Sequence, residues 1–344
     1  MMKRPTQKDV AQRAGVSRST VSCVLNGQTN QKVPISPETR EKVLQAIAEL
    51  GYEPDVRAQS LRRGSSKTIG VLFPTLQNPH FVHVLSGIQS AAQEANYSLH
   101  LSQSSLTLEQ ERLNLRDLIQ QQVDGFILLS HFKLLPSTML RHLQESGSPI
   151  VQITTTGSEF DHVRNGYSAG THALMSHLLE LGHKRIGFVY GVVEASQAYD
   201  RLLPYREALQ QAGLPVDESL VQVCGITMEA GYEAARSLLS RPDRPTALLV
   251  ASDLLAIATI RAATDLGMTV PQDVSVAGFD DIPFSNYIVP RLTTVSASPE
   301  QNGRDAVHLL LKRLEDPTRP REIIVAETEL KIRESTSPAT LWRT

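Results

Sequence analysis

The sequence predicts a small all-α unit at the N-terminus, followed by an α/β core of two lobes, each built on a doubly wound parallel sheet. Three observations lead to this fold class. The chain has 344 residues, more than one ordinary hydrophobic core accommodates. Apolar residues in the first 50 positions recur at helical spacing. From Lys67 onward, short apolar runs alternate with longer helical stretches, which is typical of parallel sheets covered by helices on both faces.

Two short helices are expected close to the N-terminus. The first runs from about Gln7 to Arg13, and Thr6 with Asp9 three residues later resembles a capping box. An Ala-Gly-Val break follows at residues 14–16, and Ser17 can cap a second helix that extends to about residue 25. Asn-Gly at residues 26–27 is a typical end for that helix.

A third helix is expected to begin at Ser36-Pro37, with serine as the N-cap and proline in the first turn. Its apolar face carries Val43, Leu44, Ile47 and Leu50. Gly51 is suited to close it, because glycine readily adopts the left-handed conformation that ends many helices. Residues 27–34, between the second and third helices, form a mostly polar loop.

The core from residue 67 onward contains a series of short apolar runs that predict strands. The candidates are residues 68–74, 97–103, 125–130, 149–154, 185–191, 220–225, 246–252 and 274–281. An enclosed barrel is the rival arrangement, but two doubly wound lobes suit this length better, with the first lobe ending near residue 165. Two later segments, residues 292–298 and 323–333, are candidates for strands that cross between the lobes.

Charge is distributed unevenly along a chain whose net charge is only −2. Residues 1–65 hold eleven basic and six acidic side chains, a charge of +5, and the remainder carries −7. A basic head on an acidic body suggests a polyanion as the partner of the head alone. No run of 18 apolar residues predicts a membrane span, and MMKRPTQKDV is not followed by the apolar region of a secretory signal. With only two cysteines, we expect a reducing, cytoplasmic location.

Two helices joined by a short glycine-containing corner, in a small basic unit, predict a helix-turn-helix. In that motif the second helix lies in the major groove, with its N-terminal residues at the base edges. Arg18 is the foremost candidate, because arginine can bind guanine through two hydrogen bonds. The plainer interpretation is a short surface helix with polar residues. The candidate DNA contacts are Thr6, Ser17, Arg18, Ser19, Thr20, Ser22, Cys23 and Asn26.

Longer stretches of the sequence carry a family resemblance. TQKDVAQRAGVSRSTVSCVLN resembles the headpiece of the lactose-repressor (LacI) family of bacterial transcription regulators, and ISPETREKVLQAIAELGYEPD resembles its third helix and the approach to its hinge. ELGHKRIGFVYG, DRLLPYREALQQAGL, VPQDVSVAGFDDIPFSNYIVPRLTTV and IRESTSP resemble its later signature stretches. The resemblance implies a DNA-binding headpiece, a hinge helix and a two-lobed, periplasmic-binding-protein-like core that forms a homodimer.

The resemblance also divides the chain. It implies a headpiece at residues 1–50, a hinge at 51–66 and an effector-binding and dimerisation domain at 67–344. Within that domain, lobe 1 is expected at about 67–165 and 296–327, and lobe 2 at about 166–295 and 328–344. Leu61 is implied as an apolar wedge in the minor groove, where such side chains bend DNA; the alternative is a residue that covers the first strand of the core.

Ligands of open α/β lobes bind beyond the carboxyl ends of the strands, which for two lobes means the cleft between them. The resemblance implies His80 and Phe81 as effector contacts from lobe 1. From lobe 2 it implies Arg201, Ile226, Ser252 and Asp280, with Ile226 aligned only loosely. Pro204 and Ser252 depart from the glycine and asparagine usual there, which weakens the expectation of a common hexose. Alternatively, Arg201 forms an inter-lobe ion pair and Asp280 caps the turn that follows.

Motifs of the common nucleotide and zinc sites are missing from the sequence. We find no G-x-x-x-x-G-K-[ST], G-x-G-x-x-G or H-E-x-x-H, so a nucleotide cofactor and a zinc site are not expected, and we do not expect an enzyme. The expected partners are operator DNA, a second copy of the chain and a small effector, with a carbohydrate as the family-level expectation, and no membrane. The alternative is a solute-binding protein or an α/β enzyme with a basic N-terminal extension.

Overall fold

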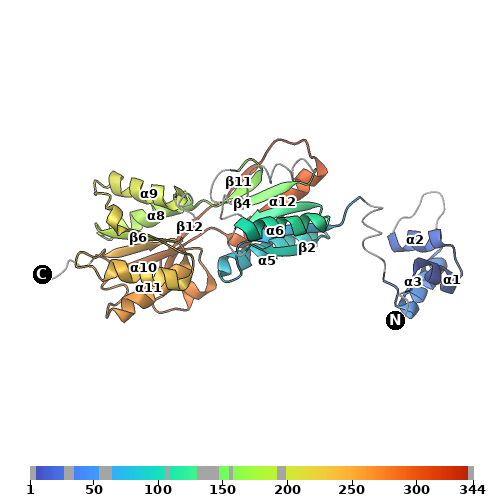
Figure 1. Ribbon diagram of the computed structural model, residues 1–344, viewed down its shortest axis with the longest axis horizontal. Helices are drawn as coiled ribbons and strands as arrows, with labels where there is room; N and C mark the ends of the chain where they lie inside the picture. The colour runs from blue at the N-terminus through green and yellow to red at the C-terminus, as the bar shows by residue number, and fades with distance from the viewer. Residues whose placement is uncertain are drawn as a thin grey trace. The chain divides into compact units, whose positions relative to one another are not determined.

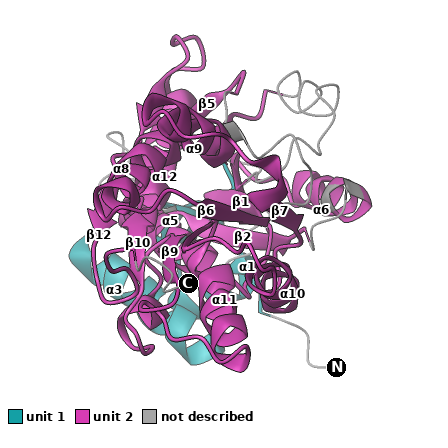
Figure 2. Ribbon diagram, turned by 90° about the vertical axis from the view of Figure 1, so that its left-hand side faces the viewer, with its two compact units in different colours: residues 1–66 teal, residues 67–344 magenta. Residues whose placement is uncertain are grey.

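The computed structural model describes residues 5–26, 35–53, 64–104, 108–129, 147–154, 158–191 and 199–339. The chain divides into two compact units, residues 1–66 and residues 67–344, coloured separately in Figure 2.

The described part of unit 1 contains the predicted helices. They are α1 (Gln7–Ala14), α2 (Arg18–Asn26) and α3 (Pro37–Leu50). The backbone N–H of Thr6 donates to the Asp9 carboxylate at 2.7 Å, so the acidic residue of the capping box holds the start of α1. Gly15 has a φ of +66°, which allows the tight corner before α2. Their small core contains Val10, Ala11, Val21, Val43, Ala46 and Tyr52.

The described strands of unit 2 form two six-stranded sheets, and we name the lobes after them. Lobe 1 has the strand order β11-β5-β4-β3-β1-β2, and lobe 2 has the order β12-β10-β9-β8-β6-β7. The lobe 1 strands are β1 (Thr68–Phe73), β2 (Ser98–Gln103), β3 (Gly125–Leu129), β4 (Ile150–Thr154), β5 (Asp161–Arg164) and β11 (Ile323–Val325). The lobe 2 strands are β6 (Ile186–Gly191), β7 (Val221–Cys224), β8 (Ala247–Val250), β9 (Ser275–Phe279), β10 (Thr293–Ser296) and β12 (Glu329–Lys331). The described pairs are parallel, except that β12 runs antiparallel to β10.

Helices cover both faces of each sheet, as Figure 1 shows. In lobe 1, α5 (Pro79–Glu94) and α12 (Pro299–Glu315) pack on one face and α6 (Leu108–Gln120) on the other. In lobe 2, α8 (Tyr167–Glu180) and α9 (Tyr199–Gln211) pack on one face, and α10 (Met228–Leu239) and α11 (Asp253–Asp265) on the other. Two short 3-10 helices, Glu218–Leu220 and Pro283–Asn286, lie in the described loops of lobe 2. This arrangement confirms the predicted doubly wound lobes.

Helices α5 and α12 cross unusually closely, and glycine makes the crossing possible. A Cβ on Gly87 would collide with the backbone carbonyl of Glu300, and a Cβ on Gly303 would collide with that of Val84. The two helices therefore pack backbone to backbone, which fixes the start of α12 beside the N-terminal half of α5.

Two details of the strands differ from the prediction. Residues 161–164 were not predicted as a strand, because Asp161 and His162 are polar, yet both are buried within β5. Residues 323–333 cross between the lobes, as predicted, but they form two strands rather than one: β11 joins the sheet of lobe 1 and β12 that of lobe 2.

The chain passes between the lobes at segments that bond to one another. The Asn302 side chain donates to the Asn165 side chain at 2.8 Å and to the Ala297 carbonyl at 2.9 Å. The Ala326 N–H donates to the Arg164 carbonyl at 2.9 Å. Residues near 165, 297 and 326 are distant in the sequence, and these bonds hold them together at the lobe junction.

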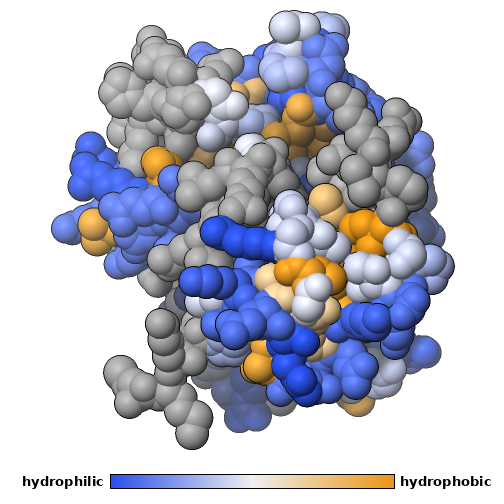
Figure 3. Space-filling view, turned by 90° about the vertical axis from the view of Figure 1, so that its right-hand side faces the viewer, coloured by the Kyte–Doolittle hydropathy of each residue, from blue (hydrophilic) through white to orange (hydrophobic). Residues whose placement is uncertain are grey.

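Within the described residues, no helix is both long and apolar enough to span a bilayer. The same residues contain no group of three or more His, Cys, Asp or Glu side chains placed to hold a metal ion. The face in Figure 3 is mainly hydrophilic, with hydrophobic residues in small separate groups.

Candidate DNA-binding helix and effector site

The N-terminus of α2 presents a cluster of hydroxyl groups. Ser17 Oγ accepts from the Thr20 N–H at 3.1 Å and lies 2.7 Å from Ser19 Oγ and 2.8 Å from Thr20 Oγ1. Ser17 therefore caps α2, as the sequence predicted. Ser17 and Ser19 are exposed and Thr20 is half-buried, so the cap lies at the surface of unit 1.

The remaining DNA-contact candidates differ in how the structure places them. Arg18 is exposed and makes no ion pair with a described residue, whereas Arg13 pairs with Glu49 at 2.5 Å. Ser22 and Cys23 are half-buried on α2, and Thr6 is exposed but also bonds to Asp9. Asn26 is the last residue of α2. Leu61 lies outside the described residues.

Three of the effector candidates meet at the lobe junction. Asp280 follows β9 of lobe 2, and its Oδ1 lies 3.6 Å from Nδ1 of His80, in the first turn of α5 in lobe 1. That separation exceeds a hydrogen bond, and His80 Nδ1 has no hydrogen-bond partner. The Arg201 guanidinium, from α9, belongs to the same cluster and interacts electrostatically with both groups. His80, Arg201 and Asp280 are 3, 6 and 5 % exposed, so a polar cluster is buried between the lobes.

Aromatic side chains that the sequence analysis missed hold this cluster. The Arg201 guanidinium stacks 3.8 Å from the centre of the Tyr167 ring and 5.0 Å from that of Phe279. Cation–π stacking of this kind fixes the plane of a buried guanidinium. The Tyr167 hydroxyl donates to Asp280 at 2.8 Å, so one ring orients both Arg201 and Asp280. Tyr167 lies in the RNGYSAG segment, whose sequence gave no signal for this role.

Two further carboxyl groups, also missed, surround the cluster. Asp200 lies 3.7 Å from the Arg201 guanidinium and accepts a hydrogen bond from the Tyr190 hydroxyl at 3.1 Å. Asp253 is fully buried and accepts from the Ile282 N–H, Ser285 Oγ and Thr294 Oγ1 at 3.0, 2.7 and 2.5 Å. Asp253 thereby anchors the loop that carries Asp280. Asp200 directly precedes Arg201 in the sequence and Asp253 directly follows Ser252, and this adjacency to candidate residues was the available clue.

Burial shifts the protonation equilibria of these groups. It lowers the pKa of His80, an effect that Asp280 partly opposes, so the imidazole is neutral near pH 7. Burial also raises the pKa of Asp200, and it raises that of Asp253 well above the usual range with help from the nearby Asp280. For Arg201, burial alone would lower the pKa, but Asp200 and the neighbouring tyrosines raise it, so the guanidinium stays charged.

The other effector candidates have structural roles in lobe 1 and lobe 2. Phe81 is buried in the lobe 1 core and contacts His80 edge to face, with ring centres 5.4 Å apart. Ser252 caps α11 and accepts from the Leu255 N–H at 3.4 Å. Ile226 lies half-buried in the loop after β7, and no hydrogen bond described in the structure connects its backbone or that of Ser252 to the cluster. The structure therefore gathers three of the six candidates directly.

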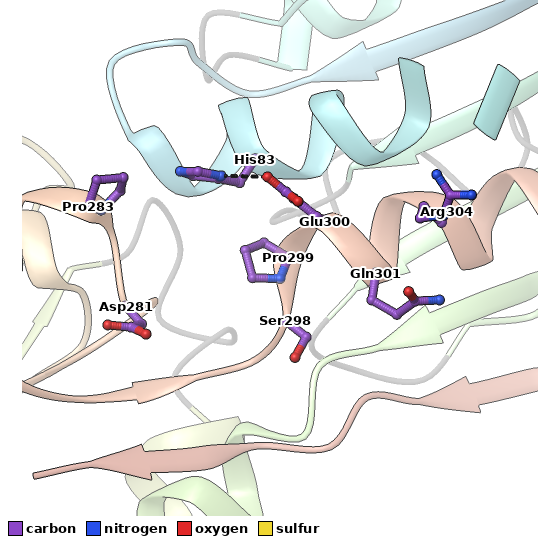
Figure 4. A pocket seen from close by; sticks show the side chains of 8 residues that line it. All are labelled: His83, Asp281, Pro283, Ser298, Pro299, Glu300, Gln301 and Arg304. Atoms are coloured by element: carbon purple, nitrogen blue, oxygen red, sulfur yellow. Dashed lines mark hydrogen bonds and ion pairs between the residues drawn. The ribbon is translucent and has the colours of Figure 1, made fainter. Parts of the chain in front are cut away.

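A pocket of about 440 Å³ opens beside the buried cluster (Figure 4). His83 of α5 and Glu300 of α12 lie on its lobe 1 side, with His83 Nδ1 3.1 Å from Glu300 Oε1. Asp281 and Pro283 come from the loop after β9 in lobe 2. His83 is one helical turn beyond His80, and Asp281 adjoins Asp280, so the pocket continues the lobe junction outward. Its remaining lining residues are Ser298, Pro299, Gln301 and Arg304.

The two parts of the chain match known family models. The model described as "Bacterial regulatory proteins, lacI family" matches residues 6–55, and that described as "Periplasmic binding protein-like domain" matches residues 175–336. The ribose operon repressor of Haemophilus influenzae is 32 % identical over 96 % of this chain and 98 % of its own length.

Solved structures agree with these matches. The lac repressor dimer bound to operator and the anti-inducer ONPF is 27 % identical, with a TM-score of 0.86, over 97 % of this chain and 100 % of that one. The transcriptional regulator CelR in complex with cellobiose is 33 % identical, with a TM-score of 0.72, over 96 % of this chain and 100 % of that one. These proteins are regulators of transcription and not enzymes. With its helical DNA-binding unit and its two-lobed α/β core, the chain belongs to the LacI family of effector-controlled, DNA-binding transcriptional repressors.

Proposed function

We propose that this repressor reads its operator with α2, in the major groove, through Arg18 and the hydroxyl cluster at Ser17, Ser19 and Thr20. Exposure at the start of the helix supports this, because residues there reach base edges and phosphates in helix-turn-helix proteins. Ser22, Cys23, Asn26 and Thr6 supply secondary contacts, and Leu61 enters the minor groove. In this scheme residues 1–50 are the headpiece, 51–66 the hinge and 67–344 the effector domain.

The effector of this proposal is a carbohydrate or a derivative of one, bound between the lobes at His80, Arg201 and Asp280. The observation that carries it is the convergence of buried polar groups from both lobes, because a ligand there contacts both sheets at once. A His80 nitrogen without a hydrogen-bond partner is a group that ligand hydroxyls can satisfy. The printed names of two relatives, a ribose operon repressor and a cellobiose-bound regulator, favour the same ligand class.

The proposal includes a homodimer, as in the lac repressor structure, acting on DNA in the bacterial cytoplasm. A second copy of the chain would cover an apolar surface formed by Phe284, Tyr287 and Val289, whose exposed fractions are 55, 84 and 91 %. Large apolar side chains exposed next to one another commonly mark such interfaces. We expect Tyr287→Asp to halve the mass measured by analytical ultracentrifugation; an unchanged mass would place the interface elsewhere.

The test of function starts by selecting operator fragments from genomic DNA with the purified protein. Affinity for the best fragment is then measured by fluorescence anisotropy, with and without ribose, glucose, cellobiose and other sugars. A sugar that changes operator affinity supports the proposal, since effector and DNA must be reciprocally coupled. Selective DNA binding that no sugar alters would reject the carbohydrate effector. Sugar binding without any selected DNA would favour a solute-binding protein.

A further inference from the structure

The buried cluster at the lobe junction contains more acidic groups than basic ones. Among the described residues, Arg201 is the only guanidinium or ammonium group that the contacts bring to it. Two carboxyl groups, Asp200 and Asp280, lie around that guanidinium, and the pKa of His80 is lowered by burial. An anion entering this junction would meet one cation whose charge is already balanced.

Asp200 is the residue that balances it. Its side chain is 6 % exposed and lies 3.7 Å from the Arg201 guanidinium. Its Oδ2 has no hydrogen-bond partner, and neither does Arg201 Nε. An unfilled acceptor and an unfilled donor, buried on adjacent residues, suit a ligand that both donates and accepts hydrogen bonds. A hydroxyl group does both, whereas a carboxylate or a fully ionised phosphate monoester only accepts.

We propose that Asp200 is a specificity-determining residue, which makes the site select an uncharged polyhydroxylated effector over its phosphorylated or carboxylated counterparts. This inference rests on the proposed effector site and narrows its ligand class. The Asp200 carboxylate repels the added charge of an anionic sugar, and it already pairs with the guanidinium to which a phosphate or carboxylate would bind. Like charges forced together at a desolvated interface cost enough to reduce affinity by about a hundredfold.

A plainer role for Asp200 exists, because it lies in the first turn of α9, where acidic residues favour the helix dipole. A purely structural residue would change thermal stability without changing the preference between neutral and anionic ligands. The ratio of the two affinities therefore separates the roles.

The experiment uses thermal shift and isothermal titration calorimetry on the full-length protein. The probes are matched sets: ribose with ribose 5-phosphate, glucose with glucose 6-phosphate and gluconate, and inorganic phosphate alone. We expect the wild type to bind a neutral member and to ignore its anionic counterparts and phosphate. In Asp200→Asn, we expect the ratio of anionic to neutral ligand affinity to rise by about tenfold or more, and we expect phosphate to raise the melting temperature.

Three variants serve as controls. Asp243→Asn removes a carboxylate that forms an ion pair with Arg185 in lobe 2. It should leave the ratio of neutral to anionic ligand affinity unchanged for every matched set. Arg201→Gln, when combined with Asp200→Asn, should abolish the rise in melting temperature that phosphate causes in the Asp200→Asn protein. Asp200→Ser provides a second variant if the asparagine protein does not fold.

The outcomes separate the selectivity from the proposed function. If no sugar binds, but phosphate stabilises only the Asp200 variant, the carbohydrate proposal fails and the selectivity is supported. Wild-type protein that binds an anionic member as tightly as its neutral partner, through Arg201, overturns the selectivity. An unchanged ratio in both Asp200 variants overturns it as well.

Discussion

Asp161→Asn is expected to destabilise lobe 1, because Asp161 is the buried centre of an ionic network. Its Oδ1 accepts from Arg313 Nη2 at 3.0 Å and from the Glu322 N–H at 2.7 Å. Its Oδ2 accepts from Arg313 Nε at 2.9 Å and from Arg319 Nη1 at 3.2 Å. The side chain is 1 % exposed and the two arginines are 17 and 14 % exposed. This network holds β5 and the segment leading to β11 against the end of α12.

The expected magnitude follows from the bonds that are lost. Asparagine keeps one acceptor oxygen and points its amide group at N–H donors, so two charge-assisted hydrogen bonds disappear. At about 1.5–3 kcal/mol each, the loss is roughly 3–6 kcal/mol. Removing one partner of a buried ion pair typically costs about 3–5 kcal/mol. Because the guanidinium groups keep some access to water, we expect about 3 kcal/mol.

Urea denaturation followed by circular dichroism measures this loss as a lower unfolding midpoint. The control is Asp316→Asn, at an exposed carboxylate near the same segment that accepts hydrogen bonds from the Thr318 N–H and hydroxyl. It should cost less than about 1 kcal/mol. A loss below about 1 kcal/mol for Asp161→Asn as well would refute the reasoning, since Asp161 would then contribute no more than a surface carboxylate.

The same network makes stability depend on pH. Burial alone would raise the pKa of Asp161, but hydrogen bonds from Arg313 and from the Glu322 backbone hold it below its ordinary value. A carboxyl with a lowered pKa stabilises the fold fully above its unfolded pKa of about 3.9, and loses that contribution as pH falls through the lower folded value. The Asn variant and wild type should therefore differ most above about pH 5 and converge in acid.

Three further predictions concern other parts of the molecule. Arg18→Ala should weaken operator binding by about 1–3 kcal/mol in fluorescence anisotropy, with Lys42→Ala as an exposed control; an effect on effector affinity alone would contradict the proposed role. Tyr167→Phe removes the hydroxyl that orients Asp280 and should weaken effector binding by about 1 kcal/mol in calorimetry, whereas unchanged binding would place the effector elsewhere. Gly87→Ala introduces a Cβ against the Glu300 carbonyl and should lower the melting temperature, through a loss of about 1–3 kcal/mol; an unchanged melting temperature would mean that the helix crossing adjusts freely.

Periodicity was sufficient to predict the helices and most strands, because their buried faces are apolar. It failed at β5, where Asp161 is buried by arginines that are about 150 residues away in the sequence. Periodicity also did not divide residues 323–333 into two strands, since both short strands alternate in similar ways; the boundary near residue 327 came only from the family resemblance.

The candidate site was predictable where a residue is both chemically distinctive and part of a family motif. His80, Arg201 and Asp280 meet these conditions, and the structure brings them together. Tyr167 did not, because its importance comes from stacking on Arg201, which is 34 residues away in the sequence. Asp200 adjoins Arg201, but the sequence does not show that its side chain is buried against the guanidinium at 3.7 Å. Phe81 differs again: the structure places it in the core of lobe 1 with its ring against His80, so its role as an effector contact stays a prediction.

The bonds among the crossing segments have a mechanical consequence. One amide, that of Asn302, joins the segment at residue 165 to the segment at residue 297, and the chain near residue 326 bonds to Arg164. Segments bonded in this way cannot slide apart independently, so the lobes must change their angle by rotating about these hydrogen-bonded segments. Displacement then grows with distance from the segments, and a sub-ångström change near them becomes a larger movement at the far ends of both lobes. The buried cluster of His80 and Asp280 is well placed to set that angle, because it bridges the two lobes.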